Sequence, residues 1–234
     1  MYGMNMGYML ITVITAAIGG LVGKMLQSKI QKYLQVPMQA GLSGAQVAKQ
    51  MLEHYGLHDV RIVEGQGFLT DHYNPQTKTI SLSPNIYQGT SVASAAVAAH
   101  ECGHAVQHAE AYSFLQMRSA IVPIVQFSAK MQQFVLMGAF MGVGLGEAIG
   151  NTLMLAAIAV FSITALFSFI TLPVEFDASK RALAWLDEAG VARGAEYDGA
   201  KDALKWAAMT YVAAALSALI MVLYLLSRLQ SRRR

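Results

Sequence analysis

Two histidines and a glutamate stand close together in residues 99–108, which read AHECGHAVQH. His100 and His104 are four residues apart, and on an α-helix such residues lie one turn apart on the same face. Their imidazole nitrogens could therefore bind one Zn²⁺, while Glu101 beside them could act as a general base on a water molecule. A chance match is the alternative, because only three of the five positions in His-Glu-x-x-His are fixed.

The residues around this motif favour a helix. Residues 91–99 are rich in alanine and contain neither proline nor glycine, and Ser91 or Thr90 could cap the helix start. Cys102 lies inside the motif but points away from the face of His100, so we expect a packing residue and not a ligand. As the only cysteine in the chain, it excludes an intramolecular disulfide.

A catalytic zinc ion takes three protein ligands, so a third must come from elsewhere in the chain. His108 is eight residues from His100, about 12 Å along a helix, which is too far for a shared ion. Glu175 directly follows an apolar run, and a membrane hairpin before it would return the chain to the side of the zinc motif. The sequence therefore predicts Glu175 as the third ligand, with a solvated carboxylate at the membrane interface as the alternative.

The composition is that of a membrane protein. Of 234 residues, 55% are hydrophobic and only 13% are charged, whereas soluble domains contain roughly 25% charged residues. The net charge of +3 comes without a basic patch interleaved with aromatic residues, which argues against nucleic acid as a partner. The lipid bilayer is the expected partner instead.

The apolar runs divide the chain into segments. We expect a mainly α membrane protein with about four transmembrane helices and a small α+β zincin-like catalytic domain that contains a short antiparallel sheet. The expected segments are an N-terminal transmembrane helix (1–26), the zincin-like domain with the His-Glu-x-x-His helix (27–120), a transmembrane helical hairpin (121–172), a third-ligand helix and polar segment (173–206), and a C-terminal transmembrane helix with a basic tail (207–234).

Within the expected domain, the pattern predicts one further helix and a hairpin. Ser43 would start a helix over 45–55, and residues 59–64 show partial strand alternation. Two β-prone runs, 68–70 and 79–82, flank a turn-rich stretch and favour a hairpin. The second run, Thr79, Ile80, Ser81 and Leu82, could pair with an extended substrate by edge addition.

Three stretches together carry a family resemblance: 69–75 (LTDHYNP), 98–107 (AAHECGHAVQ) and 171–179 (TLPVEFDAS). They resemble the YugP-type membrane zinc metallopeptidases of bacteria, and the resemblance covers nearly the whole chain. It implies a gluzincin-like site with one Zn²⁺ per chain, His100, His104 and Glu175 as ligands, and Glu101 as the base. The chain is thereby expected to be a metalloendopeptidase with a polypeptide substrate.

A more distant similarity links the chain to the HtpX-type membrane proteases, whose third-ligand motif runs Glu-x-x-Ala-Asp. Here Ser179 stands four residues after Glu175, so the carboxylate of that motif is missing. Asp177 or Asp71 could take over its task of orienting a histidine. His72, Tyr73 and Arg181 are candidate donors for an oxyanion, although His72 could equally be a surface residue of the hairpin.

Alternatives remain at the level of function and location. One is a zinc-binding membrane scaffold or regulator without proteolytic activity; a transporter or channel is disfavoured because the chain has no repeats. His54 and His58 could form a second metal pair, but no acidic or cysteine partner stands near them. A homo-oligomer or a membrane-protein complex stays open.

The side of the membrane follows from basic residues near the span ends. Nine stand on the catalytic side and four on the other, which favours a cytoplasmic catalytic face of a multi-pass protein in the bacterial inner membrane. The arginine-rich C-terminus argues the reverse.

Overall fold

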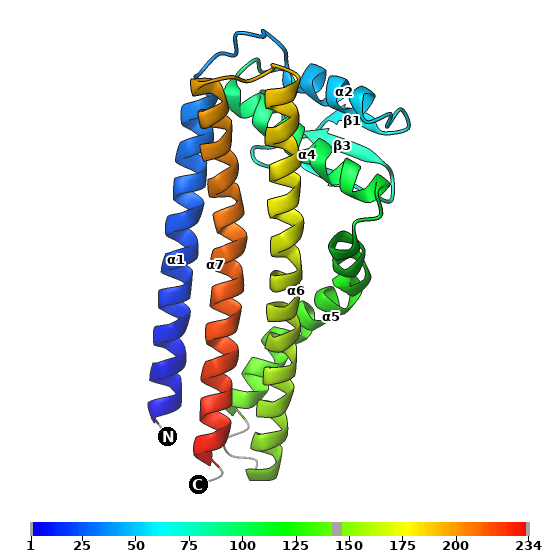
Figure 1. The fold of residues 1–234 in the computed structure, drawn as a ribbon. Helices are drawn as coiled ribbons and strands as arrows, with labels where there is room; N and C mark the ends of the chain where they lie inside the picture. The colour runs from blue at the N-terminus through cyan, green and yellow to red at the C-terminus, as the bar shows by residue number, and fades with distance from the viewer. Residues whose placement is uncertain (1, 142–146, 233–234) are drawn as a thin grey trace. The chain divides into compact units, whose positions relative to one another are not determined.

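The computed structural model describes residues 2–141 and 147–232 (Figure 1). The fold is mainly helical, with one small sheet. Its elements in chain order are α1 (Tyr2–Leu34), α2 (Gly44–His54), β1 (Arg61–Glu64), β2 (His72–Asn74), β3 (Thr79–Leu82), α3 (Pro84–Tyr87), α4 (Val92–Ala109), α5 (Ser113–Met141), α6 (Glu147–Glu188) and α7 (Ala195–Arg232).

Three of the described helices are long and apolar enough to cross a membrane: α1 from Met6 onward, α6 from Asn151 onward, and α7 as far as Ser231. This agrees with the expected membrane protein. Helix α5 is not among the spans found in the described residues. The expected transmembrane hairpin (121–172) includes residues 142–146, which lie outside the described part of the chain, so four spans stay a prediction.

The long helices do not end where the apolar runs end. Helix α1 continues to Leu34, and α6 runs through Pro173 without a break to Glu188. The expected segment boundaries at 26 and 172 therefore fall inside helices α1 and α6. Hydropathy reports where a helix leaves an apolar environment, whereas the backbone hydrogen bonds continue as long as the residues tolerate a helix.

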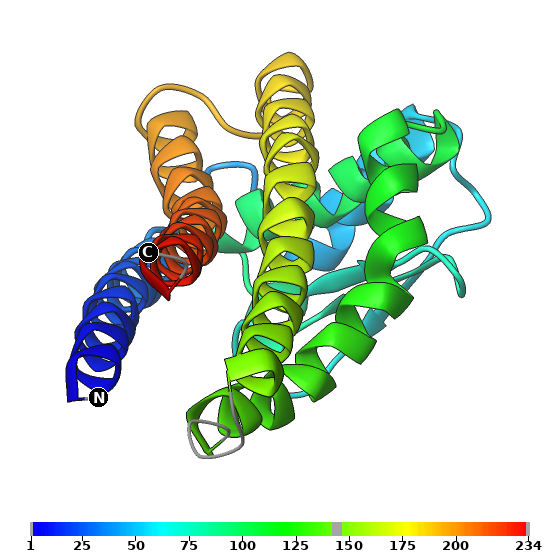
Figure 2. The same cartoon turned by 90° about the horizontal axis from the view of Figure 1, so that it is seen from below.

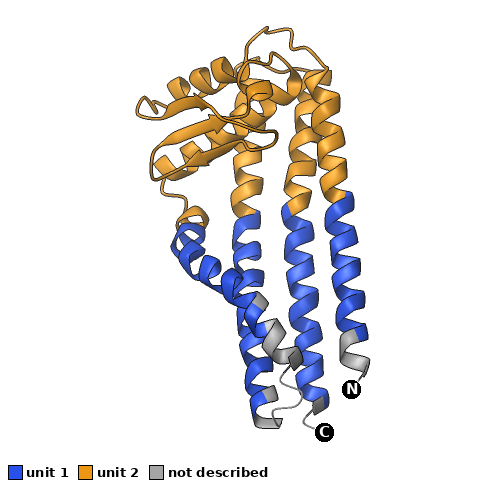
Figure 3. Cartoon of the chain, turned by 180° about the vertical axis from the view of Figure 1, so that it is seen from behind, with its two compact units in different colours: residues 1–21, 117–172, 211–234 blue, residues 22–116, 173–210 orange. Residues whose placement is uncertain are grey.

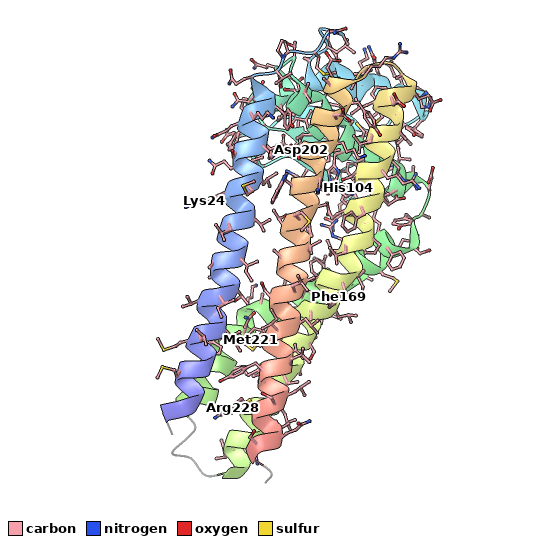
Figure 4. All side chains as sticks on the ribbon, turned by 60° about the vertical axis from the view of Figure 1, so that its left-hand side comes forward. Lys24, His104, Phe169, Asp202, Met221 and Arg228 are labelled. Carbon is pink, nitrogen blue, oxygen red and sulfur yellow. The ribbon has the colours of Figure 1, made fainter. Side chains whose placement is uncertain are left out.

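The chain forms two compact units (Figure 3). Unit 1 comprises residues 1–21, 117–172 and 211–234, and unit 2 comprises residues 22–116 and 173–210. In unit 1, Met154 and Phe161 of α6 belong to one apolar cluster with Met221 of α7, which is labelled in Figure 4. All residues of the candidate site belong to unit 2.

The sheet of unit 2 is mixed, so the expected antiparallel sheet is wrong in part. Its strand order is β1-β3-β2, with β1 parallel and β2 antiparallel to β3. Ile80 of β3 lies opposite Ile62 on one side and Tyr73 on the other. Because β3 is the central strand, Thr79–Leu82 has both edges paired and cannot accept a substrate by edge addition. That prediction is wrong.

The first strand of the expected hairpin was also misplaced. Residues 68–70 form no strand; the strand is His72–Asn74. Gly67 and Leu69 have φ values of 92° and 58°, which belong to the left-handed region and cannot occur in an extended strand. Thr70 closes this turn by donating a hydrogen bond to the carbonyl of Gln66 at 2.7 Å.

One apolar core holds unit 2 together around α4. The expected helix after Ser43 is confirmed as α2, and Ser43 and Gln46 form a capping box at its start. Met51 of α2, Leu82 of β3 and Leu186 of α6 are fully buried in this core. Within unit 2, α6 runs between α7 and the sheet (Figures 1 and 2), and the first turn of α4 packs against α7.

Candidate metal centre

Helix α4 carries the His-Glu-x-x-His residues in the interior of unit 2. Ser91 caps its start by accepting a hydrogen bond from the backbone of Ser94 at 3.2 Å, as predicted. The rings of His100 and His104 lie on the same face, with their centroids 4.8 Å apart. Both side chains are nearly buried, so the helix presents two imidazoles to a protein environment and not to bulk water.

Gly103 lets a second helix approach this face. A Cβ atom at this position would lie 2.6 Å from the backbone oxygen of Ala178 in α6, well inside van der Waals contact. Only glycine permits the two backbones to come so close. The close approach brings Glu175, which lies one helical turn before Ala178, to the two histidines. The sequence analysis did not single out this glycine.

The three side chains predicted as ligands meet in space. Oε2 of Glu175 lies 3.4 Å from Nε2 of His100 and 3.6 Å from Nε2 of His104. Two atoms that bind one zinc ion tetrahedrally at 2.0–2.1 Å lie about 3.3 Å apart, so the spacing fits such an ion. Among the described residues, this is the only group of three that could hold a metal, and it includes neither His54 nor His58.

Gln107 forms a hydrogen bond with Nδ1 of His104, the ring nitrogen that does not face Glu175. Its carboxamide nitrogen donates to the carbonyl of Val174 at 2.8 Å and to Oδ2 of Asp177 at 2.9 Å. Since both partners only accept, the carboxamide oxygen must face His104, whose Nδ1 lies 3.0 Å away. Nδ1 of His104 therefore carries the proton, and its Nε2 is left free to bind a metal.

Ser179 takes the equivalent place behind His100. Its hydroxyl lies 3.1 Å from Nδ1 of His100, and both side chains are buried. Ser179 follows Glu175 by one turn of α6, so the third ligand and this contact share a helix face. The missing carboxylate noted in the sequence is thus replaced by a hydroxyl at the same position. Asp71 does not replace it, because its carboxylate accepts hydrogen bonds from Ser83.

The electrostatics of the group favour a positive charge between the three side chains. Burial by itself would lower the pKa of His104, but the hydrogen bond and the negative charge of Glu175 outweigh it and raise that pKa above its ordinary value. Glu101 adds to the effect through its own charge. Each of these interactions would also favour a divalent cation at the same place.

Glu101 and Cys102 also lie within the motif, but neither belongs to the group of three metal-binding residues. Glu101 is nearly buried, at 7% exposure, and contributes no ligand atom to the group of three. Cys102 is fully buried, and its thiol points to the carbonyl of Ala48 at 3.5 Å. Burial raises the pKa of the Cys102 thiol well above its ordinary value, which fits an inert packing residue.

The candidates from the hairpin lie in different environments. His72 is exposed, and its Nδ1 lies 2.8 Å from the carbonyl of Thr70. The hydroxyl of Tyr73 lies 2.8 Å from Nδ1 of His108, which joins β2 to the last turn of α4. His108 thus contacts β2 and does not belong to the group of three metal-binding residues.

Asp177 and Arg181 form a linked pair on α6. Nε of Arg181 donates to Asp177 at 2.6 Å, and its Nη1 donates to Glu110 at 2.7 Å. Asp177 therefore reaches His104 only through Gln107, and two carboxylates balance the charge of Arg181. Gln107 and Ser179 are the contacts that sequence reasoning missed. The signal for Gln107 was its helical spacing, three residues after His104. Ser179, four residues after Glu175, was noted only as the position of a missing carboxylate, and its contact with His100 was not predicted.

Comparisons with known proteins agree with this geometry. A family described as "Putative neutral zinc metallopeptidase" matches residues 8–230. The chain is also 39% identical over 198 residues to "Putative membrane protease YugP" of Bacillus subtilis (strain 168), an alignment that covers 85% of each protein. No solved structure matched the chain. Since the family match spans nearly the whole sequence, the chain belongs to this family of neutral zinc metallopeptidases.

Proposed function

We propose that this protein is a zinc-dependent membrane endopeptidase. The observation that carries the proposal is the convergence of Nε2 of His100, Nε2 of His104 and one oxygen of Glu175 at 3.4–3.6 Å beside Glu101. Membership in a zinc metallopeptidase family supports zinc as the metal. A donor set of two imidazoles and one carboxylate is also a common one for catalytic zinc.

In this proposal His100, His104 and Glu175 hold one zinc ion per chain, the gluzincin arrangement. Bound zinc supplies Lewis acidity, which polarises a carbonyl and makes water more acidic. Glu101 takes the proton of the attacking water and delivers it to the nitrogen of the leaving amine. Its near-burial strengthens both proton transfers, because few water molecules compete for the carboxylate.

Gln107 and Ser179 keep the ligand nitrogens in place. Each contacts the Nδ1 side of a histidine ring, so each fixes the direction in which Nε2 points. Asp177 anchors Gln107, and Arg181 holds Asp177. We therefore assign Asp177 and Arg181 to this support of His104. An oxyanion role for His72 or Tyr73 stays a prediction.

A polypeptide substrate would bind along β2 and not along β3. Strand β2 lies at the outside of the sheet and contacts α4, so its outer edge can pair with an extended peptide next to the metal ligands. The basic residues near the span ends favour the cytoplasmic face of a bacterial inner membrane for this reaction.

The experiment measures zinc content and casein cleavage of the detergent-purified protein beside Glu175→Ala and Glu101→Gln. We expect about one zinc per chain in the wild type, its loss in Glu175→Ala, and retained zinc without cleavage in Glu101→Gln. Zinc binding by Glu175→Ala at the wild-type level would refute the third ligand. Stoichiometric zinc and hydroxamate binding by the wild type, with no cleavage of any tested polypeptide, would instead favour the scaffold without activity.

A further inference from the structure

A groove between α6 and α7 lies outside the metal centre. Its volume is about 380 Å³, which falls within the range of about 300–1,000 Å³ for small-molecule sites. The groove is lined mainly by apolar surface from Phe176, Leu183 and Leu204, and three lysines border it: Lys180, Lys201 and Lys205. Since all these residues belong to unit 2, the groove is a feature of that unit alone.

The three lysines bring uncompensated positive charge to the groove. Within the described part of the chain, none of them forms an ion pair, and no carboxylate lines the groove. The nearest acidic residues in the sequence are engaged elsewhere: Asp177 pairs with Arg181, and Asp202 (Figure 4) pairs with Lys29. The groove therefore combines an apolar wall with three exposed amines that have no carboxylate partner among the described residues.

The position of the groove along both helices matches a lipid headgroup. Lys180 follows Leu172, the last residue of the apolar run in α6, by eight residues, or about 12 Å of helix. The apolar run of α7 starts near Ala207. Lys205 precedes it by about half a turn and Lys201 by nearly two turns. Lysines just beyond an apolar run place their amines at the level of lipid phosphates.

The groove walls also argue against a peptide as the occupant. An extended peptide needs backbone partners, but both walls are helices whose backbone groups bond within the helix. A phospholipid has no peptide backbone that requires hydrogen-bond partners, and its acyl chain needs only the apolar wall. We propose that the groove binds one anionic phospholipid, with its phosphate at Lys180, Lys201 and Lys205 and an acyl chain against Phe176, Leu183 and Leu204.

This site lies next to the metal centre without being part of it. Ser179 lines the groove and at the same time contacts Nδ1 of His100, so a bound lipid covers the outer side of the Ser179–His100 contact. The proposal does not depend on the proposed protease activity, because lipid binding is measured without substrate or metal.

The experiment titrates the detergent-purified full chain with dioleoyl phosphatidylglycerol or dioleoyl phosphatidylcholine and counts bound lipids by native mass spectrometry. We expect a preference for phosphatidylglycerol in the wild type. The variant Lys180→Gln/Lys201→Gln/Lys205→Gln should lose roughly 10- to 100-fold in affinity for it, because each lysine near an anionic lipid contributes about a factor of five. Ala184→Trp, which fills the groove and keeps all charges, should lose the same lipid.

The matched control is Lys24→Gln/Lys32→Gln/Lys49→Gln, which removes the same charge outside the groove and should keep the preference. Circular dichroism and the apparent melting temperature verify folding of each variant. Equal binding of both lipids by the wild type would overturn the proposal, as would an equal loss in the control variant. Displacement of phosphatidylglycerol by a blocked Leu-Glu-Leu-Glu-Leu-Glu peptide, at lower concentration than the lipid requires, would make the groove a peptide site instead.

Discussion

The carboxamide oxygen of Gln107 lies 3.0 Å from Nδ1 of His104, and the carboxamide nitrogen lies 2.9 Å from Asp177 on the other helix. One side chain thus ties a ligand on α4 to the helix that provides Glu175. Because Gln107 is fully buried, water cannot replace these hydrogen bonds when they are lost. The orientation of His104 therefore depends on Gln107.

Gln107→Leu should weaken zinc binding without removing a ligand. Leucine keeps the volume approximately but leaves Nδ1 of His104 without its acceptor, while Asp177 keeps only the hydrogen bond from Arg181. Partners of this kind typically account for 10- to 100-fold in metal affinity. Competition with a zinc chelator measures the change, and Gln50→Leu on the exposed face of α2 serves as control. Unchanged zinc affinity in Gln107→Leu would contradict the positioning role.

Ser179 offers a second test with opposite outcomes for two substitutions. Ser179→Ala removes the contact with Nδ1 of His100 and should lower zinc affinity by about tenfold. Ser179→Asp should keep or raise the affinity, because a carboxylate at this position accepts the Nδ1 proton and increases the basicity of the ring. The same chelator competition applies, with Ser168→Ala on α6 as control. A larger loss in Ser179→Asp than in Ser179→Ala would show that the hydroxyl is not replacing a carboxylate.

The three ligand residues could be predicted from helical spacing and from the expected membrane topology. The pair His100 and His104 was predicted from their four-residue interval. Glu175 was predicted because the membrane hairpin before it would bring the chain back to the side of the zinc motif. Neither argument reaches the residues behind the ligands. Gln107 contacts Val174 and Asp177, which are about 70 residues away in the sequence, and no local pattern specifies such a pairing.

The fold was predictable to the same extent. Membrane character follows from composition, and helix α2 follows from Ser43 and the helical spacing after it. Strand pairing depends on contacts between distant segments. The parallel pairing of β1 with β3 gives no local turn signal, so only the antiparallel neighbour was expected. The strand predicted over 68–70 was wrong because side-chain preference does not report the backbone turn. These side chains favour a strand, but Leu69 has a φ of 58° and the backbone turns tightly before β2.

Gly103→Ala should separate α4 from α6. The added methyl group would lie 2.6 Å from the backbone oxygen of Ala178, and backbone cannot move aside as a flexible side chain can. We expect destabilisation by about 1–3 kcal/mol and weaker zinc binding, because Glu175 moves with α6. Gly23→Ala in α1 is the matched control, since no atom outside its own helix lies within 4 Å. There alanine should be neutral or stabilising by up to about 1 kcal/mol.

Both variants are compared by apparent melting temperature and by chelator competition. If Gly103→Ala melts with the wild type and binds zinc equally well, the close approach of the two helices is not needed for the site.

The raised pKa of His104 predicts a specific pH dependence. In the metal-free protein Glu175 holds a proton on His104, so this interaction stabilises the fold fully below the ordinary histidine pKa of about 6.5. The contribution is lost as pH rises through the higher pKa of the folded protein. Zinc binding has the opposite sign: it strengthens as pH rises through that same pKa, because the proton and the metal compete for Nε2.

Nuclear magnetic resonance of the imidazole C–H groups in metal-free protein measures this titration directly. Wild-type His104 should titrate above about 6.5. In Glu175→Gln the charge that contributes most to the raised pKa is gone, so His104 should titrate at a lower pH than in the wild type. A His104 titration that does not respond to Glu175→Gln would contradict the electrostatic coupling between these two side chains.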